Sequence, residues 1–198
     1  MPPVTQALII VNVIVYLLEM MGGMPLFGWF ALWPPTSGPS GAPDFQVWQL
    51  VTYSFLHSPN NIAHIFFNMF ALYMFGSDIE RLFGPRFYLA YYFVSVVSAA
   101  ICHLVVTAFM GAEPAPMVGA SGGVYGLLLA YGIYFPNRQL MLLIPPIPMR
   151  ARTFVIVFAV LELVLGVTGT AAGVAHFAHL GGMIWGYLMI RYRRGFRT

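Results

Sequence analysis

Four polar side chains interrupt long apolar stretches of this sequence, and their types could support acyl-transfer chemistry. They are His64, Asn68, Ser121 and His179. A serine hydroxyl is a weak nucleophile until a base takes its proton, and a histidine can take that proton and later give it to a leaving amine. The tetrahedral intermediate needs donors for its oxyanion, and His64 and Asn68 can each donate. These residues would form one hydrolytic site if the chain brought them together.

The backbone around Ser121 suits the same chemistry. We expect Ser121 within the first turns of a helix, where backbone N–H groups and a partial positive charge favour an oxyanion. Gly119, Gly122 and Gly123 surround it in the sequence and leave room for a substrate backbone to approach. The sequence therefore predicts a nucleophile next to backbone N–H groups that can donate to the oxyanion.

The composition places these residues in a membrane. Hydrophobic residues make up 60% of the chain and charged residues 8%, and the mean hydropathy is +0.80, whereas soluble domains carry roughly 25% charged residues. The net charge of +3 comes from nine basic residues that are all arginine and lie scattered between apolar runs, which argues against nucleic-acid binding. The single cysteine, Cys102, excludes an intrachain disulfide. We expect one membrane domain over residues 1–198.

The elements that position the polar residues are helices long enough to cross a bilayer, which takes roughly 20 apolar residues. We predict an all-α polytopic bundle of six transmembrane helices. We interpret the first apolar run as a retained helix, because it has no basic region before it and no convincing cleavage site. The predicted segments are Val4–Met21, Asn61–Ser77, Phe87–Phe109, Val118–Phe135, Thr153–Thr168 and Ala172–Ile190.

The arginines predict the orientation of these helices. With six spans, every arginine falls on one side, and that side is cytoplasmic because positive charge concentrates there. Both termini are then cytoplasmic, and the long loop at residues 22–60 is external. This loop holds Trp29, Trp33 and Trp48, and we expect it in the membrane interface, which tryptophan favours.

The four polar residues are predicted to share one shallow layer near the external face. Each lies one to two turns from the external end of its helix, and His64 and Asn68, four residues apart, share one helix face. Small residues recur every fourth position on the fourth segment (Gly122, Gly126, Ala130) and on the sixth (Ala178, Gly182, Gly186). Such stripes let helices approach closely, and contact between these two would bring the serine and histidine within reach.

Other titratable residues leave alternatives open. His176 precedes His179 by one turn and is a rival base. Glu162, in the middle of the fifth segment at a similar depth, could orient a histidine. We expect it instead to be a protonated, hydrogen-bonded glutamate that faces the bundle, because an isolated carboxylate in a low dielectric gains a proton. We interpret His57 and His103 as structural.

At these residues the sequence resembles the rhomboid family of intramembrane serine proteases. Residues 119–122 (G-A-S-G) match the family's G-x-S-G nucleophile motif, and residues 179–186 match its catalytic H-x-x-G-x-x-x-G pattern. Residues 64–68 match the H-x-x-x-N pair. Each motif alone is weak, but three in the right order on the second, fourth and sixth spans are specific. The resemblance extends from the first span to the last.

The resemblance implies roles for the individual residues. Ser121 and His179 would form a catalytic dyad without an acidic third member. His64, Asn68 and the Ser121 backbone would form the oxyanion hole, with Gly119 and Gly122 supporting the nucleophile. Tyr125 matches the family tyrosine that packs against the catalytic histidine. Gly76 and Glu80-Arg81 resemble structural positions of the family, whereas Trp48-Gln49 replaces its usual Trp-Arg.

The resemblance also implies a substrate and a location. The substrate would be a single-span transmembrane protein, cleaved near the external membrane face through an acyl-enzyme. The fifth helix and the Gly166–Gly173 turn would control its lateral entry. No cofactor, metal or nucleic acid is implied, and the protein would be a multi-pass protein of a prokaryotic inner membrane.

Three rival functions are less consistent with the sequence. Non-catalytic rhomboid relatives that bind membrane clients typically lack the serine or the histidine, and both are present here. A metal or haem protein could use His64, His176 and His179, but no H-E-x-x-H motif is present. A transporter would show broken helices in inverted repeats, and these are not evident.

Overall fold

The structure is a computed structural model that describes residues 1–22, 24–35, 43–110, 115–142, 146–169 and 173–195. Helices dominate it, as predicted. Residues 170–172 of the predicted Gly166–Gly173 turn, and Arg197, one of the arginines used to predict the orientation, lie outside the described residues. The elements are α1 (Pro3–Gly22), α2 (Met24–Phe30), α3 (Gln49–Thr52), the 3-10 turn η1 (Tyr53–Phe55), α4 (Ile62–Ala71), the π-helical η2 (Leu72–Gly76), α5 (Ser77–Phe83), α6 (Pro85–Met110), α7 (Ser121–Tyr134), β1 (Gln139–Met141), β2 (Pro148–Arg150), α8 (Ala151–Thr168) and α9 (Gly173–Gly195).

Four helices in the described part of the chain are long and apolar enough to cross a membrane. They are Pro3–Gly22, Ile62–Phe83, Pro85–Met110 and Ala151–Thr168, and the second comprises α4, η2 and α5 in one continuous run. They correspond to the first, second, third and fifth predicted segments. The fourth corresponds to α7, whose 14 residues rise only about 21 Å. The sixth is α9, whose histidines and glycines lower its hydropathy, so the six-span count stays a prediction.

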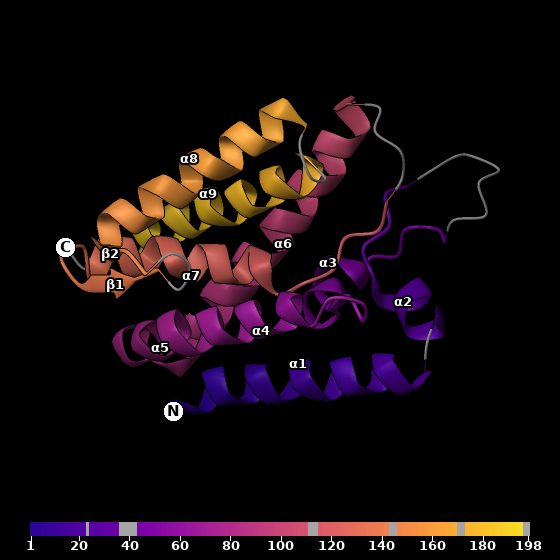
Figure 1. Ribbon diagram of the computed structural model, residues 1–198, viewed down its shortest axis with the longest axis horizontal. Helices are drawn as coiled ribbons and strands as arrows, with labels where there is room; N and C mark the ends of the chain where they lie inside the picture. The colour runs from indigo at the N-terminus through magenta and orange to yellow at the C-terminus, as the bar shows by residue number, and fades with distance from the viewer. Residues whose placement is uncertain (23, 36–42, 111–114, 143–145, 170–172, 196–198) are drawn as a thin grey trace.

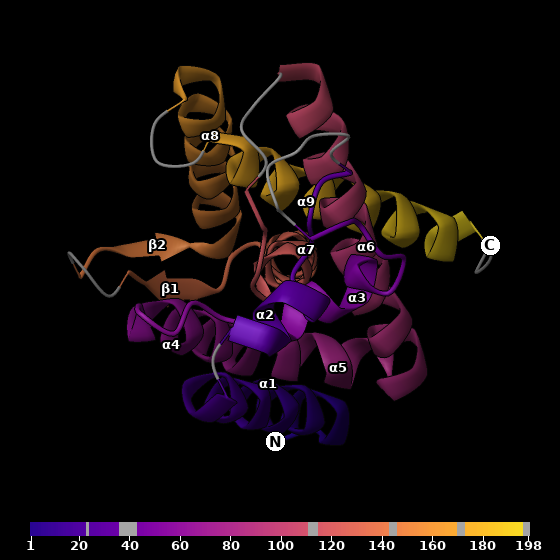
Figure 2. The ribbon, with the colours of Figure 1, turned by 90° about the vertical axis from the view of Figure 1, so that its right-hand side faces the viewer.

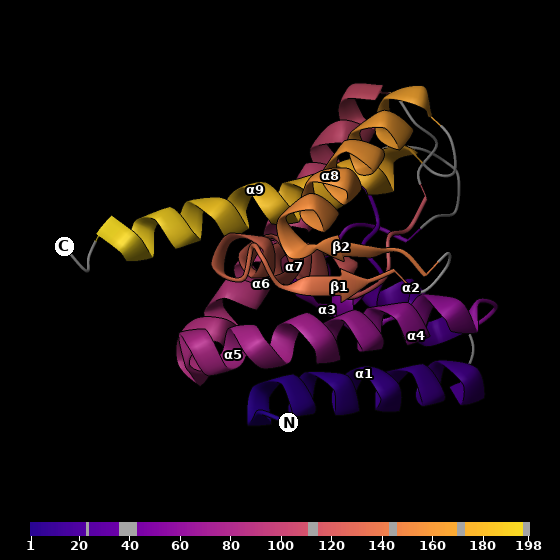
Figure 3. The same ribbon diagram turned by 60° about the vertical axis from the view of Figure 1, so that its left-hand side comes forward.

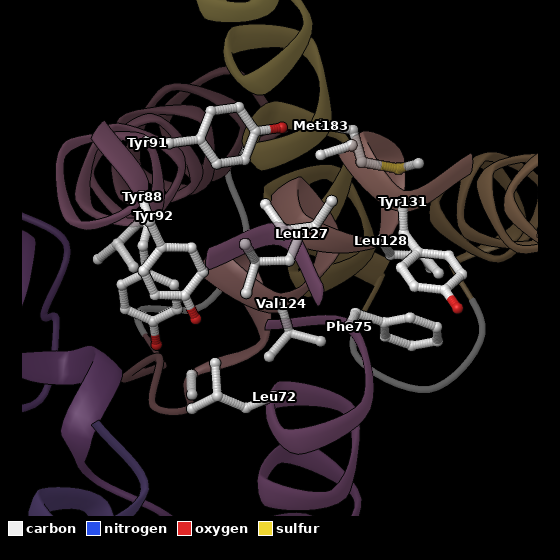
Figure 4. Close-up of a cluster of buried hydrophobic side chains, with 14 of the residues drawn as sticks. Leu72, Phe75, Tyr88, Tyr91, Tyr92, Val124, Leu127, Leu128, Tyr131 and Met183 are labelled. Carbon is white, nitrogen blue, oxygen red and sulfur yellow. The ribbon is translucent and has the colours of Figure 1, made fainter. Parts of the chain in front are cut away.

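The short helix α7 lies in the centre of the bundle. Figure 2 shows it end-on, with α4 below it, α6 beside it and α8 above, and it also packs against α9. Buried side chains of α7 such as Val124 and Leu127 meet the large aromatic rings of α6, including Tyr91 and Tyr92 (Figure 4). The Tyr91 hydroxyl donates to the Gly126 carbonyl over 2.7 Å. The first residue of α7 is thereby fixed in the middle of the molecule.

Apolar side chains cover the outward faces of the flanking helices. Ile14 and Leu17 of α1 are 51% and 55% exposed, and Val160 and Val167 of α8 are 53% and 71% exposed. A soluble monomer rarely leaves such continuous apolar surface in contact with water, whereas lipid tails cover it without cost. This distribution supports an integral membrane protein.

Charge gathers at one end of the bundle. The amino end of α1 and the carboxyl end of α9 lie at the same end, opposite α2 and α3 (Figure 1). The described arginines lie in elements that begin or end there too, namely α5, α6, β2, α8 and α9, or, for Arg138, directly before β1. This is the arrangement expected if that end is cytoplasmic, although the direction of the membrane itself stays a prediction.

The purely all-α prediction missed a small hairpin. β1 and β2 pair antiparallel, with Leu140 opposite Met149, and Figure 3 shows the hairpin between α8 and α4. Its strands have three residues each, too short for a period-two hydrophobic pattern to stand out. Within the described part of the loop at residues 22–60 lie the short helices α2 and α3 and the turn η1.

A buried glutamate fastens α1 to the helix that carries His64 and Asn68. The Glu80 carboxylate accepts hydrogen bonds from the backbone N–H groups of Val4 and Thr5 over 2.9 and 2.7 Å. The Thr5 hydroxyl donates to it as well, over 2.7 Å. A carboxylate at a helix amino terminus satisfies otherwise unpaired donors and complements the helix dipole. The family-like glutamate therefore has a structural contact at the end of the bundle away from Ser121.

Candidate active site

Ser121 and His179 meet in the interior of the bundle. Ser121 is the first residue of α7, and His179 lies two turns into α9. The His179 Nε2 and Ser121 Oγ atoms are 2.8 Å apart, which is hydrogen-bonding distance. A serine hydroxyl that donates to an imidazole nitrogen is arranged for general-base activation.

Glycine allows the two helices to approach this closely. A Cβ atom placed on Gly182 of α9 would collide with the carbonyl oxygen of Gly122 of α7, and one on Gly122 would lie 2.6 Å from the Ala99 Cβ of α6. Because one of these neighbours is backbone, no side-chain rotation could relieve the clash. The predicted contact between the two small-residue stripes is confirmed at this crossing, while Gly186 packs instead against Tyr91.

The ring of His179 is fixed from two directions. The Tyr125 ring stacks on it with centroids 4.3 Å apart and planes inclined by 5°. On the other ring nitrogen, His179 Nδ1 lies 3.0 Å from Glu162 Oε2 of α8. The same oxygen is 2.6 Å from His176 Nδ1, and the Tyr125 hydroxyl hydrogen-bonds to Glu162 Oε1. Glu162 faces the bundle, as expected, but its partners include the histidine next to Ser121.

His64 and Asn68 lie on α4 beside the serine. The Asn68 side-chain amide lines the same cavity as Ser121 and donates one hydrogen bond to the His64 carbonyl over 2.9 Å. Gly119, at φ +124°, has no Cβ, and one built there would lie 2.8 Å from His64 Nε2 and 3.7 Å from Ser121 Oγ. The imidazole and the hydroxyl therefore share the space in front of Gly119.

The segment that enters α7 is tied to the first loop. Leu32 and Met117 exchange two backbone hydrogen bonds of 3.0 and 2.9 Å, and the Gly119 N–H donates to the Tyr53 carbonyl over 3.0 Å. The Tyr53 hydroxyl in turn donates to Val96 of α6 over 2.8 Å. The position of the nucleophile thus depends on the fold of the long loop.

Gln49 organises that loop, and its role was not predicted. Its side chain is 1% exposed, and its Oε1 atom accepts from the backbone N–H groups of Trp33 and Gln46, each over 3.2 Å. Its amide donates to the Trp29 carbonyl over 3.3 Å. Where the family usually has an arginine, this chain therefore has the neutral side chain of Gln49, which bonds to the loop backbone. A buried arginine at this position would need a counter-charge.

The ring of His57 packs against the ring of His64, with ring centroids 5.0 Å apart. It belongs to the connection between η1 and α4 and is fully buried. Burial, with the nearby His64 ring, lowers the pKa of His57 to about 4. His57 is therefore neutral, and its interpretation as structural fits this buried environment.

A cavity of about 420 Å³ leads to the serine. Its polar lining includes Ser121, Asn68 and Tyr125, and the rest is predominantly apolar. It lies between α4 with η2 on one side and α8 on the other, with β1 at one end. Its apolar lining comprises Phe67, Phe70, Ala71, Met74, Phe75, Val124, Leu128, Leu140, Met141, Leu142, Phe154 and Phe158. A largely apolar access route suits a hydrophobic substrate segment.

One geometric observation supports the alternative that the site binds a metal. Ligand atoms of Glu162, His176 and His179 all lie within 4.8 Å of one another, and two histidines with one glutamate can bind zinc. His64, the third histidine of the predicted metal alternative, lies instead beside Gly119. The expectation that the protein uses no metal stays a prediction.

Comparisons with known sequences bear on this site. Residues 44–195 match the family model described as Rhomboid domain. The chain is 33% identical over 146 residues to "RHOMBOID-like protein 12, mitochondrial" of Arabidopsis thaliana, covering 67% of this chain and 42% of that protein. It is 30% identical over 142 residues to "Rhomboid protease GluP" of Bacillus subtilis, covering 71% and 25%. Against "Rhomboid protease GlpG" of Yersinia pestis it is 28% identical over 189 residues, covering 94% and 61%. The chain thus spans less than two thirds of the length of each of these relatives.

Proposed function

Because the chain belongs to the rhomboid family, we propose that it is an intramembrane serine endopeptidase in which Ser121 is the nucleophile and His179 the general base. The observation that carries this proposal is the 2.8 Å separation of Ser121 Oγ and His179 Nε2. The pair lies next to an apolar cavity that also contains Asn68. Two of the relatives are themselves named rhomboid proteases.

The proposed reaction has two halves. In the first, Ser121 Oγ attacks the scissile carbonyl while its proton moves to His179 Nε2, and that proton then passes to the leaving amine. Ser121 is left as an acyl ester. In the second, His179 takes a proton from water, the hydroxide attacks the ester, and the proton returns to Ser121 as the carboxylic acid is released.

The developing oxyanion needs fixed donors. The side chains of His64 and Asn68 and the backbone N–H of Ser121 are proposed to supply them. Their closeness to Ser121 supports this role, because Gly119 leaves no side chain between His64 and the hydroxyl. Loss of one such donor in serine proteases costs about 100- to 1000-fold in kcat.

The proposed substrate is a single-span transmembrane protein. Its helix would approach from the lipid through the apolar cavity between α4 and α8, with local unwinding to expose a peptide bond. The aromatic pair Phe75–Phe154, with ring centroids 6.2 Å apart, spans this route from η2 to α8. We further propose six spans with both termini in the cytoplasm, which the arginine distribution supports, in a prokaryotic inner membrane.

The test is cleavage of a labelled single-span substrate by purified protein in liposomes. Wild type is compared with Ser121→Ala and His179→Ala, and each is also treated with a fluorophosphonate that labels activated serines. We expect both variants to lose cleavage and labelling, while His176→Ala keeps measurable cleavage. Cleavage that survives in Ser121→Ala would overturn the serine mechanism. A wild type that is neither labelled nor active on several substrates would overturn the enzymatic proposal.

A further inference from the structure

We infer that Glu162 is a positioning residue for His179, so that the site is a Ser121–His179–Glu162 triad. The carboxylate would hold the imidazole in the orientation and tautomer that Ser121 requires. This inference rests on the proposed serine-protease function. It adds an acidic third member to a dyad for which the family resemblance implies none.

The first argument is that the His179 imidazole contacts Ser121 through one ring nitrogen and Glu162 through the other. Ser121 Oγ lies 2.8 Å from Nε2, and Glu162 Oε2 lies 3.0 Å from Nδ1. A neutral imidazole carries one N–H, and an ionised carboxylate can only accept hydrogen bonds. The proton therefore belongs on Nδ1, where it is donated to Glu162. Nε2 is then left with its lone pair facing the serine hydroxyl, which is the tautomer that a general base needs.

The second argument is that the carboxylate is itself held in place. The Tyr125 hydroxyl donates to Oε1, and His176 Nδ1 lies 2.6 Å from Oε2. The Glu162 side chain is only 9% exposed, and a buried charge persists only where donors replace water. Groups on α7 and α9 thus converge on one residue of α8. The sequence led us to expect a protonated, hydrogen-bonded Glu162, whereas this number of donors lets the carboxylate stay ionised.

The third argument concerns charge during the reaction. When Ser121 transfers its proton to Nε2, His179 becomes an imidazolium, and no proton needs to reach Glu162. A carboxylate 3.0 Å from Nδ1 stabilises that cation, and the low dielectric of the bundle strengthens the interaction. The stabilisation is larger in the transition state than in the resting enzyme, so it should appear in kcat rather than in KM.

The kinetic experiment uses Glu162→Gln, which keeps the shape of the side chain and removes its charge. An amide can also donate to Nδ1 and so favour the wrong tautomer. We expect kcat to fall about 100-fold with little change in KM, and Glu162→Asp to recover about tenfold of that loss. Fluorophosphonate labelling of Ser121 should slow in parallel. All assays contain a chelator, because a cation held by the Glu162 cluster would occupy the same carboxylate.

Glu80→Gln is the matched control. Glu80 is also a buried glutamate, but its carboxylate binds the amino end of α1. We expect this variant to lower the melting temperature while its kcat, measured well below that temperature, stays near wild type. If kcat of Glu80→Gln fell as far as that of Glu162→Gln, loss of a buried glutamate would lower kcat through stability alone. That result would overturn the inference.

A spectroscopic measurement separates positioning from stability. The nitrogen-15 shifts of His179, assigned by comparison with His179→Gln, distinguish the two neutral tautomers. We expect the proton on Nδ1 in wild type and a shifted or mixed tautomer in Glu162→Gln. An unchanged tautomer with wild-type kcat in Glu162→Gln would overturn the triad and leave the dyad standing. Loss of activity in Ser121→Ala but not in Glu162→Gln would likewise overturn the triad alone, so the two proposals fail separately.

Discussion

The phenol ring of Tyr125 lies flat against the imidazole of His179, with ring centroids 4.3 Å apart, and its hydroxyl reaches Glu162. One side chain therefore contacts both the proposed base and the carboxylate that faces it. The ring limits the rotation of His179, and the hydroxyl holds Glu162. These two contributions can be separated because phenylalanine keeps the first and removes the second.

We expect Tyr125→Phe to lower kcat about three- to tenfold, the size that corresponds to the loss of one hydrogen bond of about 1 kcal/mol. Tyr125→Leu should lower it further, because the stacked ring is lost as well. Steady-state cleavage in liposomes measures both. Tyr73→Phe serves as control, since Tyr73 is 55% exposed on η2 and should behave as wild type. Equal activity of Tyr125→Phe and wild type would show that the hydroxyl does not contribute.

Gly119→Ala should impair catalysis more than stability. Gly119 has φ +124°, and its added Cβ would lie 2.8 Å from His64 Nε2. We expect displacement of His64 and a fall in kcat of about 100-fold, the size found when one oxyanion donor is lost. Gly84→Ala is the control, because Gly84 also has a positive φ of +77° but nothing lies within 4 Å of its Cβ position. It should lower the melting temperature and leave kcat unchanged; similar kinetics for the two variants would contradict the role of His64.

Gln49→Ala should loosen the first loop. The change leaves the backbone N–H groups of Trp33 and Gln46 without their acceptor, which costs about 1–3 kcal/mol for a buried donor. We expect a lower melting temperature and faster proteolysis within residues 22–60. Because Leu32 is bonded to Met117 just before the nucleophile, kcat should fall too. Gln139→Ala, at an exposed position of β1, should change none of these properties.

His57 should make the fold sensitive to acid. Its folded pKa of about 4 lies below the ordinary value of 6.5, so the unfolded chain binds a proton first as the pH falls. The stability contributed by neutral His57 is complete above pH 6.5 and is lost between about pH 6.5 and 4. Over that window the free energy of unfolding falls by on the order of 3 kcal/mol, because one pKa unit corresponds to about 1.36 kcal/mol. We expect melting temperatures of wild type and His57→Leu to diverge on acidification, with the wild type falling faster; parallel curves would contradict this.

Much of the candidate site could be proposed from the sequence because its motifs are local. The spacing of His64 and Asn68, and the glycines around Ser121 and after His179, are visible in the sequence. The stripes of small residues correctly indicated that the helices carrying Ser121 and His179 touch. Membership of the rhomboid family, suggested by those motifs, is confirmed by the match over residues 44–195.

Other features depend on contacts that no local pattern records. Whether Glu162 points at His179 depends on the rotation of α8 about its own axis, and its apolar neighbours on all sides do not fix that rotation. Gln49 is an ordinary polar residue until the chain folds back and presents Trp33 to it. The β1–β2 hairpin forms from a mixed apolar and proline-containing stretch that carries no strand signal.

The five residues of η2, Leu72–Gly76, form a π-helical turn in the middle of a spanning helix. Such a turn accommodates one residue more than an α-helix would, and each residue of an α-helix accounts for about 100° of rotation. An uninterrupted α-helix of the same residues would have almost the same length and the same hydropathy. It would nevertheless rotate Glu80 by about that angle relative to His64 and Asn68, so that one helix could no longer serve both α1 and the serine. The π-helical turn therefore sets the rotational phase between the two halves of this helix, so that His64 and Asn68 can face the serine while Glu80 faces α1.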